Sequence, residues 1–315
     1  MPELSAQNLL VSIRENIENV IVGKPQVIDL VLICLVCGGH ALIEDVPGLG
    51  KTTLVSALAR SVDCSFQRLQ FTPDVIPSDV TGFTMYDVKT GEKQFFHGAV
   101  MTNIMLADEI NRTSPKTQSA LLQAMQEGHI TVDGNTYKLP SPFMVLATQN
   151  PVELTGTYPL PEAQLDRFLM RISMGYPDKL DEVRILEKNK SKERLIPLEP
   201  VANAETVLKL QEQLDDITCS NAVIGYIVEI ARRTREHKEV MLGVSPRGSI
   251  ALMRASMGRA MLAGREYVLP DDVQAMLLPV LSHRLVLRSQ AYVQNQTAET
   301  VLKGILQTTA VPAMK

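Results

Sequence analysis

A glycine-rich segment has the residue types that bind phosphate. Pro47-Gly48-Leu49-Gly50-Lys51-Thr52-Thr53 lies between a short apolar run, Ala41 to Ile43, and a helical pattern from Lys51 to Ser61. Glycines let backbone N–H groups surround a phosphate, and a helix N-terminus adds positive potential. Lys51 would reach the β- and γ-phosphates, and Thr52 would ligate magnesium. The pattern predicts a P-loop that binds ATP with Mg²⁺, although Asp45 stands where the strict pattern has glycine. An ordinary glycine turn would not explain a lysine and two threonines in succession.

Two adjacent acids form the second candidate group. Asp108 and Glu109 follow the apolar run Ile104 to Ala107, which reads as a buried parallel strand. Ligands of such sheets bind at the carboxyl ends of the strands. There Asp108 would hold magnesium through water, and Glu109 would polarise the attacking water. Adjacent acids can also merely solvate a strand end, but after a P-loop the catalytic interpretation is favoured.

Three more polar residues are candidates for the same chemistry. Asn150 follows the run Phe143 to Thr148 and could orient the lytic water, although an Asn-Pro turn is the alternative. Arg167 could equally form a surface ion pair worth under about 1 kcal/mol. Arg247 follows Ser245-Pro246, a helix start at which a cation opposes the helix dipole. A nucleotide phosphate nearby would resolve that conflict, whereas snorkelling into solvent is the alternative.

The elements that would position these residues follow a doubly wound α/β pattern. Two helices are predicted from Leu4 to Leu35, with a turn at Val22-Gly23-Lys24-Pro25, and another helix from Pro115 to Glu127. Residues 82–100 and 129–139 alternate in polarity around Lys89-Thr90-Gly91 and Asp133-Gly134-Asn135. Both segments read as β-hairpins inserted in the core.

A second, all-helical domain is predicted beyond Pro177. A charged stretch from Asp178 to Arg194 leads into four helical patterns, at 204–214, 220–236, 246–262 and 270–281. The predicted division is a nucleotide-binding core over residues 1–195, a helical domain over 200–290 and a C-terminal tail over 291–315. The tail has one weak helical pattern near 298–306.

Composition narrows the function classes. The 315 residues are 45% apolar, which is enough for a large core. The longest apolar run, Val27 to Val36, is too short to cross a bilayer, and no basic-then-apolar leader begins the sequence, so a cytoplasmic location is expected. The net charge of −4 offers no general affinity for nucleic acid. Cys34 and Cys37 form a CxxC on one face of an apolar helix, where packing is the favoured role.

The order of the motifs resembles the AAA+ ATPases and, among them, the MoxR family. The stretches that carry the resemblance are IVGKPQVIDLVL, GGHALIEDVPGLGKTTL, LQFTPDVIPSDVTG, NIMLADEINRTSPKTQSALLQAMQEG, FMVLATQNPVELTGTYPLPEAQLDRFLMRISMGYP and GVSPRGSIALMRA. They fall within about Ile21 to Leu287, and the Asp45-Val46 departure is itself usual in MoxR proteins. The implied fold is an α/β AAA+ P-loop core, with a parallel sheet between helices, and a smaller all-helical lid domain.

The resemblance also implies a role for each candidate. Lys51 and Thr52 match Walker A, and Asp108 and Glu109 match Walker B. Asn150 matches sensor 1, Arg167 the arginine finger and Arg247 sensor 2, while Val22-Gly23 matches the position that packs against adenine. The two hairpins resemble the helix-2 insertion and the pre-sensor hairpin, which face the central pore in related rings. Arg167 is expected to act in trans, at the site of a neighbouring subunit.

The biological role is implied by resemblance alone. Family members form homo-oligomeric rings, here expected to be hexamers, and hydrolysis is expected to move the lid against the core. They remodel a protein client, a complex or a metalloenzyme, often with a von Willebrand factor A-domain partner. A nucleic-acid translocase and the motor subunit of a metal chelatase are the alternatives. The hairpins carry equal numbers of basic and acidic residues, which disfavours binding of a nucleic-acid phosphate backbone. These residues are Lys89, Lys93 and Lys138, and Asp87, Glu92 and Asp133. A GTPase switch is the least favoured reading, since no Asn-Lys-x-Asp element is present.

Overall fold

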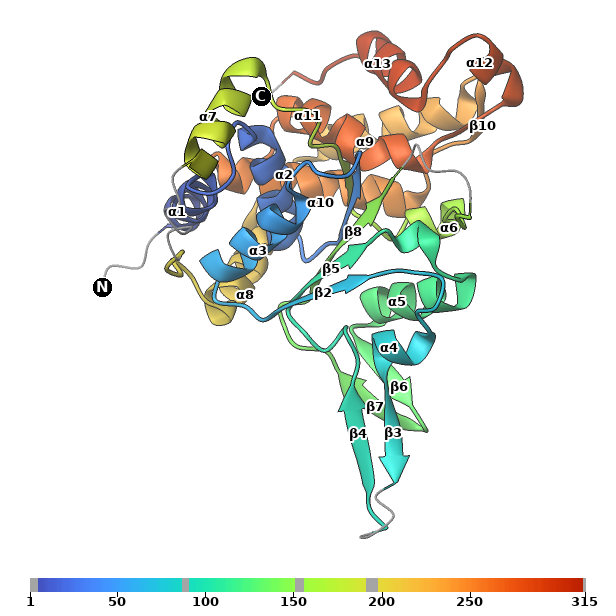
Figure 1. The fold of residues 1–315 in the computed structure, drawn as a ribbon. Helices are drawn as coiled ribbons and strands as arrows, with labels where there is room; N and C mark the ends of the chain where they lie inside the picture. The colour runs from blue at the N-terminus through green and yellow to red at the C-terminus, as the bar shows by residue number, and fades with distance from the viewer. Residues whose placement is uncertain (1–4, 87–90, 151–155, 191–197, 314–315) are drawn as a thin grey trace.

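A five-stranded parallel sheet forms the centre of the first half of the chain (Figure 1). The computed structural model describes residues 5–86, 91–150, 156–190 and 198–313. Lys89 and Thr90 of one predicted turn, Pro151 and the predicted domain boundary at 195 lie outside these ranges. The strand order is β2-β5-β8-β1-β9. The strands are β1 (Ala41–Glu44), β2 (Phe66–Gln70), β5 (Ile104–Asp108), β8 (Met144–Gln149) and β9 (Met170–Ile172).

Both faces of this sheet are buried, as expected of parallel strands. Alternate residues such as Ile43 and Leu106 pack on one side, and Leu42 and Ala107 pack on the other. The first side is covered by α1 (Ala6–Glu18), α2 (Pro25–Val36) and α3 (Lys51–Ser61), and the second by α5 (Pro115–Glu127). Because the strands are parallel, all their carboxyl ends lie along one edge of the sheet.

The predicted helices and core strands are confirmed, but several elements were not predicted, among them β2, β9 and one helix of the core. The strands β2 and β9 lack the run of apolar residues that predicts a buried strand. The sequence of β2 is FQRLQ, which is mostly polar, and β9 has only three residues. The charged stretch after Pro177 contains a helix, α7 (Lys179–Lys190). Its charged residues hide the apolar period on which the prediction of a helix depends.

Both predicted hairpins are present and project together from one end of the core (Figure 1). The first consists of β3 (Gly82–Tyr86) and β4 (Lys93–His97), and the second of β6 (His129–Val132) and β7 (Asn135–Lys138). The rings of Phe95 and Tyr137 stack between the two hairpins, with their centroids 4.0 Å apart. Phe83, Met85 and Tyr86 remain about half exposed on the first hairpin. The short helix α4 (Pro77–Thr81) precedes β3.

The second half of the chain is helical except for one pair of short strands, β10 (Val240–Leu242) and β11 (Val286–Leu287). The prediction of an all-helical second domain is therefore wrong at this strand pair. Segments of two and three residues are too short to show the alternation of apolar and polar residues that predicts a strand. Within the predicted tail, α13 packs its buried residues Val301, Leu302 and Ile305 toward α9 and α11. The helices are α8 (Ala204–Gln213), α9 (Asn221–Glu236), α10 (Pro246–Leu262), α11 (Pro270–Leu281), α12 (Ser289–Val293) and α13 (Ala298–Thr308).

One apolar core joins the helical half to the α1–α2 face of the sheet. At the junction, a Cβ built on Gly258 of α10 would lie 2.9 Å from Ile33 Cγ2 and 3.0 Å from Cys37 Sγ of α2. Cys34 and Cys37 are buried there, and burial raises the pKa of the Cys37 thiol to about 12. The CxxC therefore serves packing. None of the helices in the described ranges is long and apolar enough to span a membrane.

Candidate active site

The P-loop joins the carboxyl end of β1 to the start of α3. Gly48 and Gly50 both have a φ of 86°, a left-handed conformation that glycine adopts without strain. A Cβ at either glycine would meet no atom within 4 Å, so open space lies above the loop. Gly50 is the N-cap of α3, and no side chain caps that helix. The first N–H groups of the helix, from Lys51 to Thr53, are therefore available to an anion.

Lys51 is held over this loop. Its ammonium donates a hydrogen bond to the carbonyl oxygen of Asp45 at 2.8 Å. Partial burial lowers the pKa of Lys51, while the nearby carboxylates of Asp45, Asp108 and Glu109 oppose that shift. The lysine thus lies between the P-loop and the acidic pair, where a phosphate chain would need a cation.

The side chain of Asp45 explains the departure from the strict P-loop pattern. It is buried, and it accepts hydrogen bonds from Ser173 Oγ at 3.0 Å, from the backbone N–H of Gly175 at 3.3 Å and from the N–H of Met174. These three residues directly follow β9, the neighbour of β1. The carboxylate thereby ties the P-loop to the adjacent chain segment, a role that glycine could not fill.

Asp108 ends β5 with both carboxylate oxygens engaged. Thr148 of β8 donates its hydroxyl to Oδ1 at 2.7 Å, and Arg68 of β2 contacts Oδ2 through Nη2 at 2.7 Å and through Nε at 3.2 Å. A cation therefore already lies beside this carboxylate. Arg68 is a site residue that the sequence analysis missed, because the polar strand that carries it was not predicted.

Glu109 has a left-handed backbone, with a φ of 58°, which is uncommon outside glycine. Its N–H donates to Thr148 Oγ1 at 2.9 Å, so the two acids share one threonine. The carboxylate is 3.3 Å from Arg112 Nε and 3.5 Å from Gln70 Nε2. This geometry presents the carboxylate at the carboxyl edge of the sheet, beside that of Asp108.

Asn150, Val22 and Gly23 are the remaining candidates on this side of the molecule. Asn150 is buried directly after β8, and β8 lies between β5 and β1. Asn150 is thus brought between the acidic pair and the P-loop. Val22 and Gly23 form the turn between α1 and α2 and line a cavity of about 420 Å³ beside α7. Gly23 has a φ of 71°, and a Cβ there would overlap the carboxylate of Asp181, so glycine is favoured at this turn.

Arg167 and Arg247 lie at the opposite edge of the sheet. Both line a cavity of about 240 Å³, together with Gly38 and Gly39, which lead into the amino end of β1. The P-loop leaves the other end of the same strand. Among the residues that the structure describes, neither guanidinium has a hydrogen bond or ion pair. The fold therefore separates these two arginines from the P-loop of their own chain.

Comparison with known proteins agrees with this arrangement. Residues 40–170 match the model of the ATPase family associated with various cellular activities (AAA), and residues 232–305 match the AAA lid domain. Chaperone MoxR1 of Mycobacterium tuberculosis is 40% identical over 309 residues, which cover 94% of this chain and 80% of MoxR1. The chain belongs to the MoxR family of AAA+ ATPases.

Two more relatives extend along almost the whole length of this MoxR protein. The uncharacterized protein YeaC of Bacillus subtilis is 50% identical over 301 residues, covering 96% of this chain and 94% of YeaC. A crystal structure from Cytophaga hutchinsonii, assigned as an ATPase, superimposes with a TM-score of 0.91. That protein is 36% identical and the match covers 98% of this chain and 96% of the other. The AAA+ core with its lid domain is thus confirmed, whereas the division at 195–200 stays a prediction.

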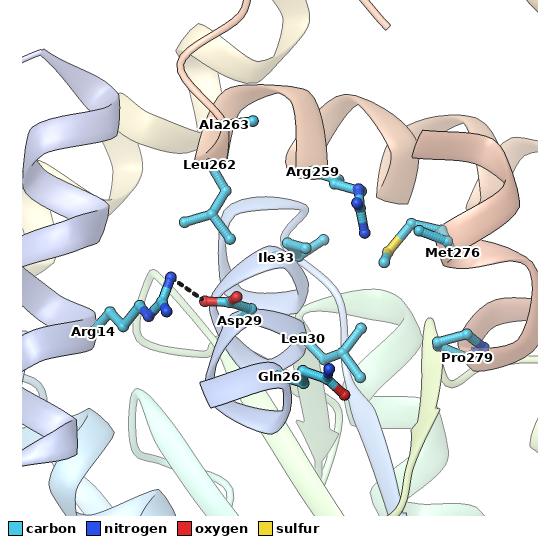
Figure 2. A pocket seen from close by; sticks show the side chains of 11 residues that line it. Arg14, Gln26, Asp29, Leu30, Ile33, Arg259, Leu262, Ala263, Met276 and Pro279 are labelled. Carbon is cyan, nitrogen blue, oxygen red and sulfur yellow. Dashed lines mark ion pairs between the residues drawn. The ribbon is translucent and has the colours of Figure 1, made fainter. Parts of the chain in front are cut away.

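A further cavity, of about 460 Å³, marks the junction of core and lid in this MoxR protein (Figure 2). Arg14 of α1 and Asp29 of α2 form an ion pair at 3.3 Å on the core side, and Arg259 and Met276 face them from α10 and α11. Burial raises the pKa of Asp29, and the charge of Arg14 opposes that shift. The cavity lies over α1 and α2, away from the P-loop residues.

Proposed function

We propose that this MoxR protein hydrolyses ATP at a site completed by a neighbouring subunit, and that it uses the reaction to remodel a protein client. One observation carries the proposal. Arg167 and Arg247 line one cavity at the edge of the sheet opposite to the P-loop of their own chain, and neither has a partner in the described ranges. In a ring, that edge can meet the P-loop edge of the next subunit.

The substrate would be held by this chain's own P-loop. The N–H groups at the start of α3 and the ammonium of Lys51 would bind the phosphates. Thr52 and Asp108 supply the oxygen ligands that Mg²⁺ prefers, and the ion would neutralise phosphate charge. Arg68 already places a cation beside Asp108 in the structure, which fits that role. Glu109 would then polarise the attacking water, and Asn150 would orient it.

The neighbour would supply the missing positive charge. A guanidinium delivered to a transferring phosphoryl group is worth about 10³ to 10⁵ in rate. Arg167 would act as this finger, and Arg247 would add a second contact to the same phosphates. Two unpaired guanidinium groups in one cavity otherwise repel each other, and an anion from the next subunit would relieve that repulsion.

The proposed client is a protein. The paired hairpins expose Phe83, Met85 and Tyr86, which suit apolar peptide contacts, and one relative is named a chaperone. A hexameric ring and a partner with a von Willebrand factor A domain are part of this proposal, on family resemblance alone. A nucleic-acid translocase and a chelatase motor remain the alternatives; DNA-stimulated hydrolysis would favour the first, and stimulation by a chelatase partner with a metal-porphyrin substrate would favour the second.

The test mixes two inactive variants. Arg167→Ala keeps an intact P-loop, and Lys51→Ala keeps an intact finger. If the finger acts in trans, some interfaces of a mixed ring pair both intact parts. Hydrolysis should then partly return on mixing, with ring formation followed by native mass spectrometry.

A linked ring sharpens the result. Subunits fused in one chain, with a single Arg167→Ala, should lose hydrolysis at one neighbouring site. Loss at the mutated subunit's own site would refute the trans arrangement. Loss at every site would indicate instead that one defective subunit stalls the ring, and the mixing experiment would then give no recovery.

A further inference from the structure

Arg284 lines the same cavity as Arg167 and Arg247, but its guanidinium, unlike theirs, is bound to other groups in the part of the chain that the structure describes. Its side chain is only 3% exposed, and its Nε binds Asp166 Oδ1 at 2.7 Å. The rest of the guanidinium donates to backbone carbonyls. The acceptors are Phe168 at 2.6 Å, Leu169 at 3.2 Å, Asp166 at 3.3 Å and Val280. These contacts occupy the donors of Arg284, so it cannot reach out to an anion as Arg167 and Arg247 can.

Three of these four carbonyl acceptors belong to one short segment of the core, whereas Val280 belongs to α11 of the lid. Asp166, Phe168 and Leu169 flank Arg167 on both sides, so Arg284 holds the backbone that carries the finger. Arg284 itself belongs to the lid, directly after α11, in the short helix Ser282–Arg284. Arg284 therefore fastens the finger segment of the core to the lid, and its neighbour His283 adds a contact of 3.1 Å between Nε2 and the Phe168 carbonyl oxygen.

The same carboxylate also contacts the start of the helix that carries Arg247. Ser245, the N-cap of α10, donates its hydroxyl to Asp166 Oδ2 at 3.3 Å and accepts from the N–H of Gly248 at 3.2 Å. A Cβ on Gly248 would lie 3.0 Å from Arg284 Cδ and 2.7 Å from a methyl group of Val244. The helix start thus packs directly on Arg284, and glycine permits that approach.

We propose that Arg284 is a positioning residue for both Arg167 and Arg247. Through Asp166 it holds the finger segment and the start of α10 as one unit, so the lid and the finger approach the neighbouring nucleotide together. The inference rests on the proposed trans site. Positioning matters because a displacement of about 1 Å in a catalytic group can cost about 10²-fold in rate.

Two variants test this role. Arg284→Lys keeps a cation but cannot form the fork of contacts, and Asp166→Asn keeps the shape but removes the charge. Each should lower kcat of the assembled protein about 10- to 100-fold and change KM less than about threefold. ATP affinity at the subunit's own P-loop, measured by calorimetry, should stay within about twofold, since that site lies at the other edge.

Asp272→Asn is the matched control. Asp272 is 2% exposed and pairs with Arg265 at 2.7 Å and Arg259 at 3.2 Å, so this variant also breaks a buried ion pair of the lid. Asp272 belongs to α11, and its partner Arg259 lies in the last turn of α10, whereas Arg247 lies in the first turn. Its kcat should change less than about threefold. An equal loss of kcat in Asp272→Asn and Asp166→Asn would assign the effect to general loosening of the lid and overturn the proposal.

The decisive measurement is additivity. Arg284→Lys is introduced into the Arg167→Ala/Arg247→Ala protein, and hydrolysis of labelled ATP is followed over hours. If Arg284 acts only through these arginines, the Arg284→Lys substitution should lower the hydrolysis rate of this protein less than about threefold. The same 10- to 100-fold loss in both backgrounds would overturn the positioning role. Wild-type hydrolysis by Arg167→Ala/Arg247→Ala would instead overturn the proposed trans site, and the positioning role with it.

Discussion

Asp45 shows how one side chain can replace a glycine and add an anchor. Its carboxylate binds Ser173, Met174 and Gly175, which follow the neighbouring strand β9. The position of Lys51 depends on the same residue, because the lysine ammonium donates to the Asp45 carbonyl. At this position, the P-loop is thus held from outside as well as by its own glycines.

Asp45→Gly introduces the residue that the strict P-loop pattern has at this position, but it should destabilise the protein. It leaves the buried N–H of Met174 without its acceptor and adds backbone freedom. We expect a loss of about 2 to 3 kcal/mol in the free energy of unfolding, measured in urea. Asp45→Asn, which keeps one oxygen acceptor, should lose less. Equal stability of Asp45→Gly and the wild type would show that the anchor contributes nothing.

Substitution of Lys51 should weaken ATP binding, whereas substitution of Glu109 should slow ATP hydrolysis without weakening binding. Lys51→Ala removes the ammonium over the P-loop, so ATP affinity should fall at least about tenfold. Glu109→Gln keeps the volume of the side chain but cannot polarise water, so it should bind ATP normally and hydrolyse it about 10² to 10⁴ times more slowly. Calorimetry and phosphate release measure the two effects. Unchanged affinity in Lys51→Ala would remove that residue from the phosphate site.

His40 joins three elements at the amino edge of the sheet. Leading into β1, it accepts a hydrogen bond from the N–H of Val145 in β8 at Nδ1 and donates from Nε2 to the carbonyl of Met125 in α5, both at 3.0 Å. This pattern requires the neutral ring. Burial lowers the pKa of His40 from 6.5 to about 4; the Met125 carbonyl opposes the shift, and the charge of Arg247 adds to it.

The lowered pKa predicts acid sensitivity of the fold. Between pH 6.5 and about 4, the unfolded chain binds a proton that the folded His40 does not. Its contribution is complete above pH 6.5 and is lost as the pH falls toward 4, by about 2 kcal/mol at pH 5. In His40→Gln, the free energy of unfolding should fall by about 2 kcal/mol less than in wild type between pH 7 and 5. If the free energy of unfolding depended on pH in the same way in both proteins, this role of His40 would be contradicted. Burial also lowers the pKa of His283, but His283 is present in both proteins, so its effect cancels in the comparison.

At the scale of the whole molecule, the lid and core are joined by close helix packing. Gly258 of α10 lets the helix approach Ile33 and Cys37 of α2. The apolar core is continuous across this junction, so the two halves form one packed unit on the α1–α2 face. The P-loop and the arginine cavity lie at opposite ends of β1, and α10 lines part of that cavity through Arg247, Ile250 and Ala251.

Gly258→Leu should force the lid away from the core. Its Cβ would overlap α2, and overpacking of this kind costs about 1 to 3 kcal/mol. Gly225→Leu is the matched control, since a Cβ on this helical glycine of α9 meets nothing within 4 Å. That variant should be unchanged or more stable by up to about 1 kcal/mol, because leucine favours a helix over glycine. Thermal unfolding compares the two, and equal effects would rule out tight packing at Gly258.

Much of this protein could be predicted from local patterns in the sequence. The bounds of α3, α5, α10 and α11 follow from their apolar periods and from Pro or Gly at their ends. The P-loop and the pair Asp108-Glu109 were also found locally, because strand, turn and helix follow one another within a few residues. The polar strand β2 was missed, and Arg68 with it, since its burial comes from neighbours that are distant in the sequence.

The tertiary structure alone decided where these residues meet. No local signal shows that Asp45 anchors to the segment after β9, or that Arg284 binds Asp166, which lies 118 residues away in the sequence. The sequence identified Arg167 and Arg247 separately, but the order and direction of the parallel strands place both at one edge and the P-loop at the other. Strand order is fixed by long-range packing, so the separation that underlies the proposed trans site appears only in the folded chain.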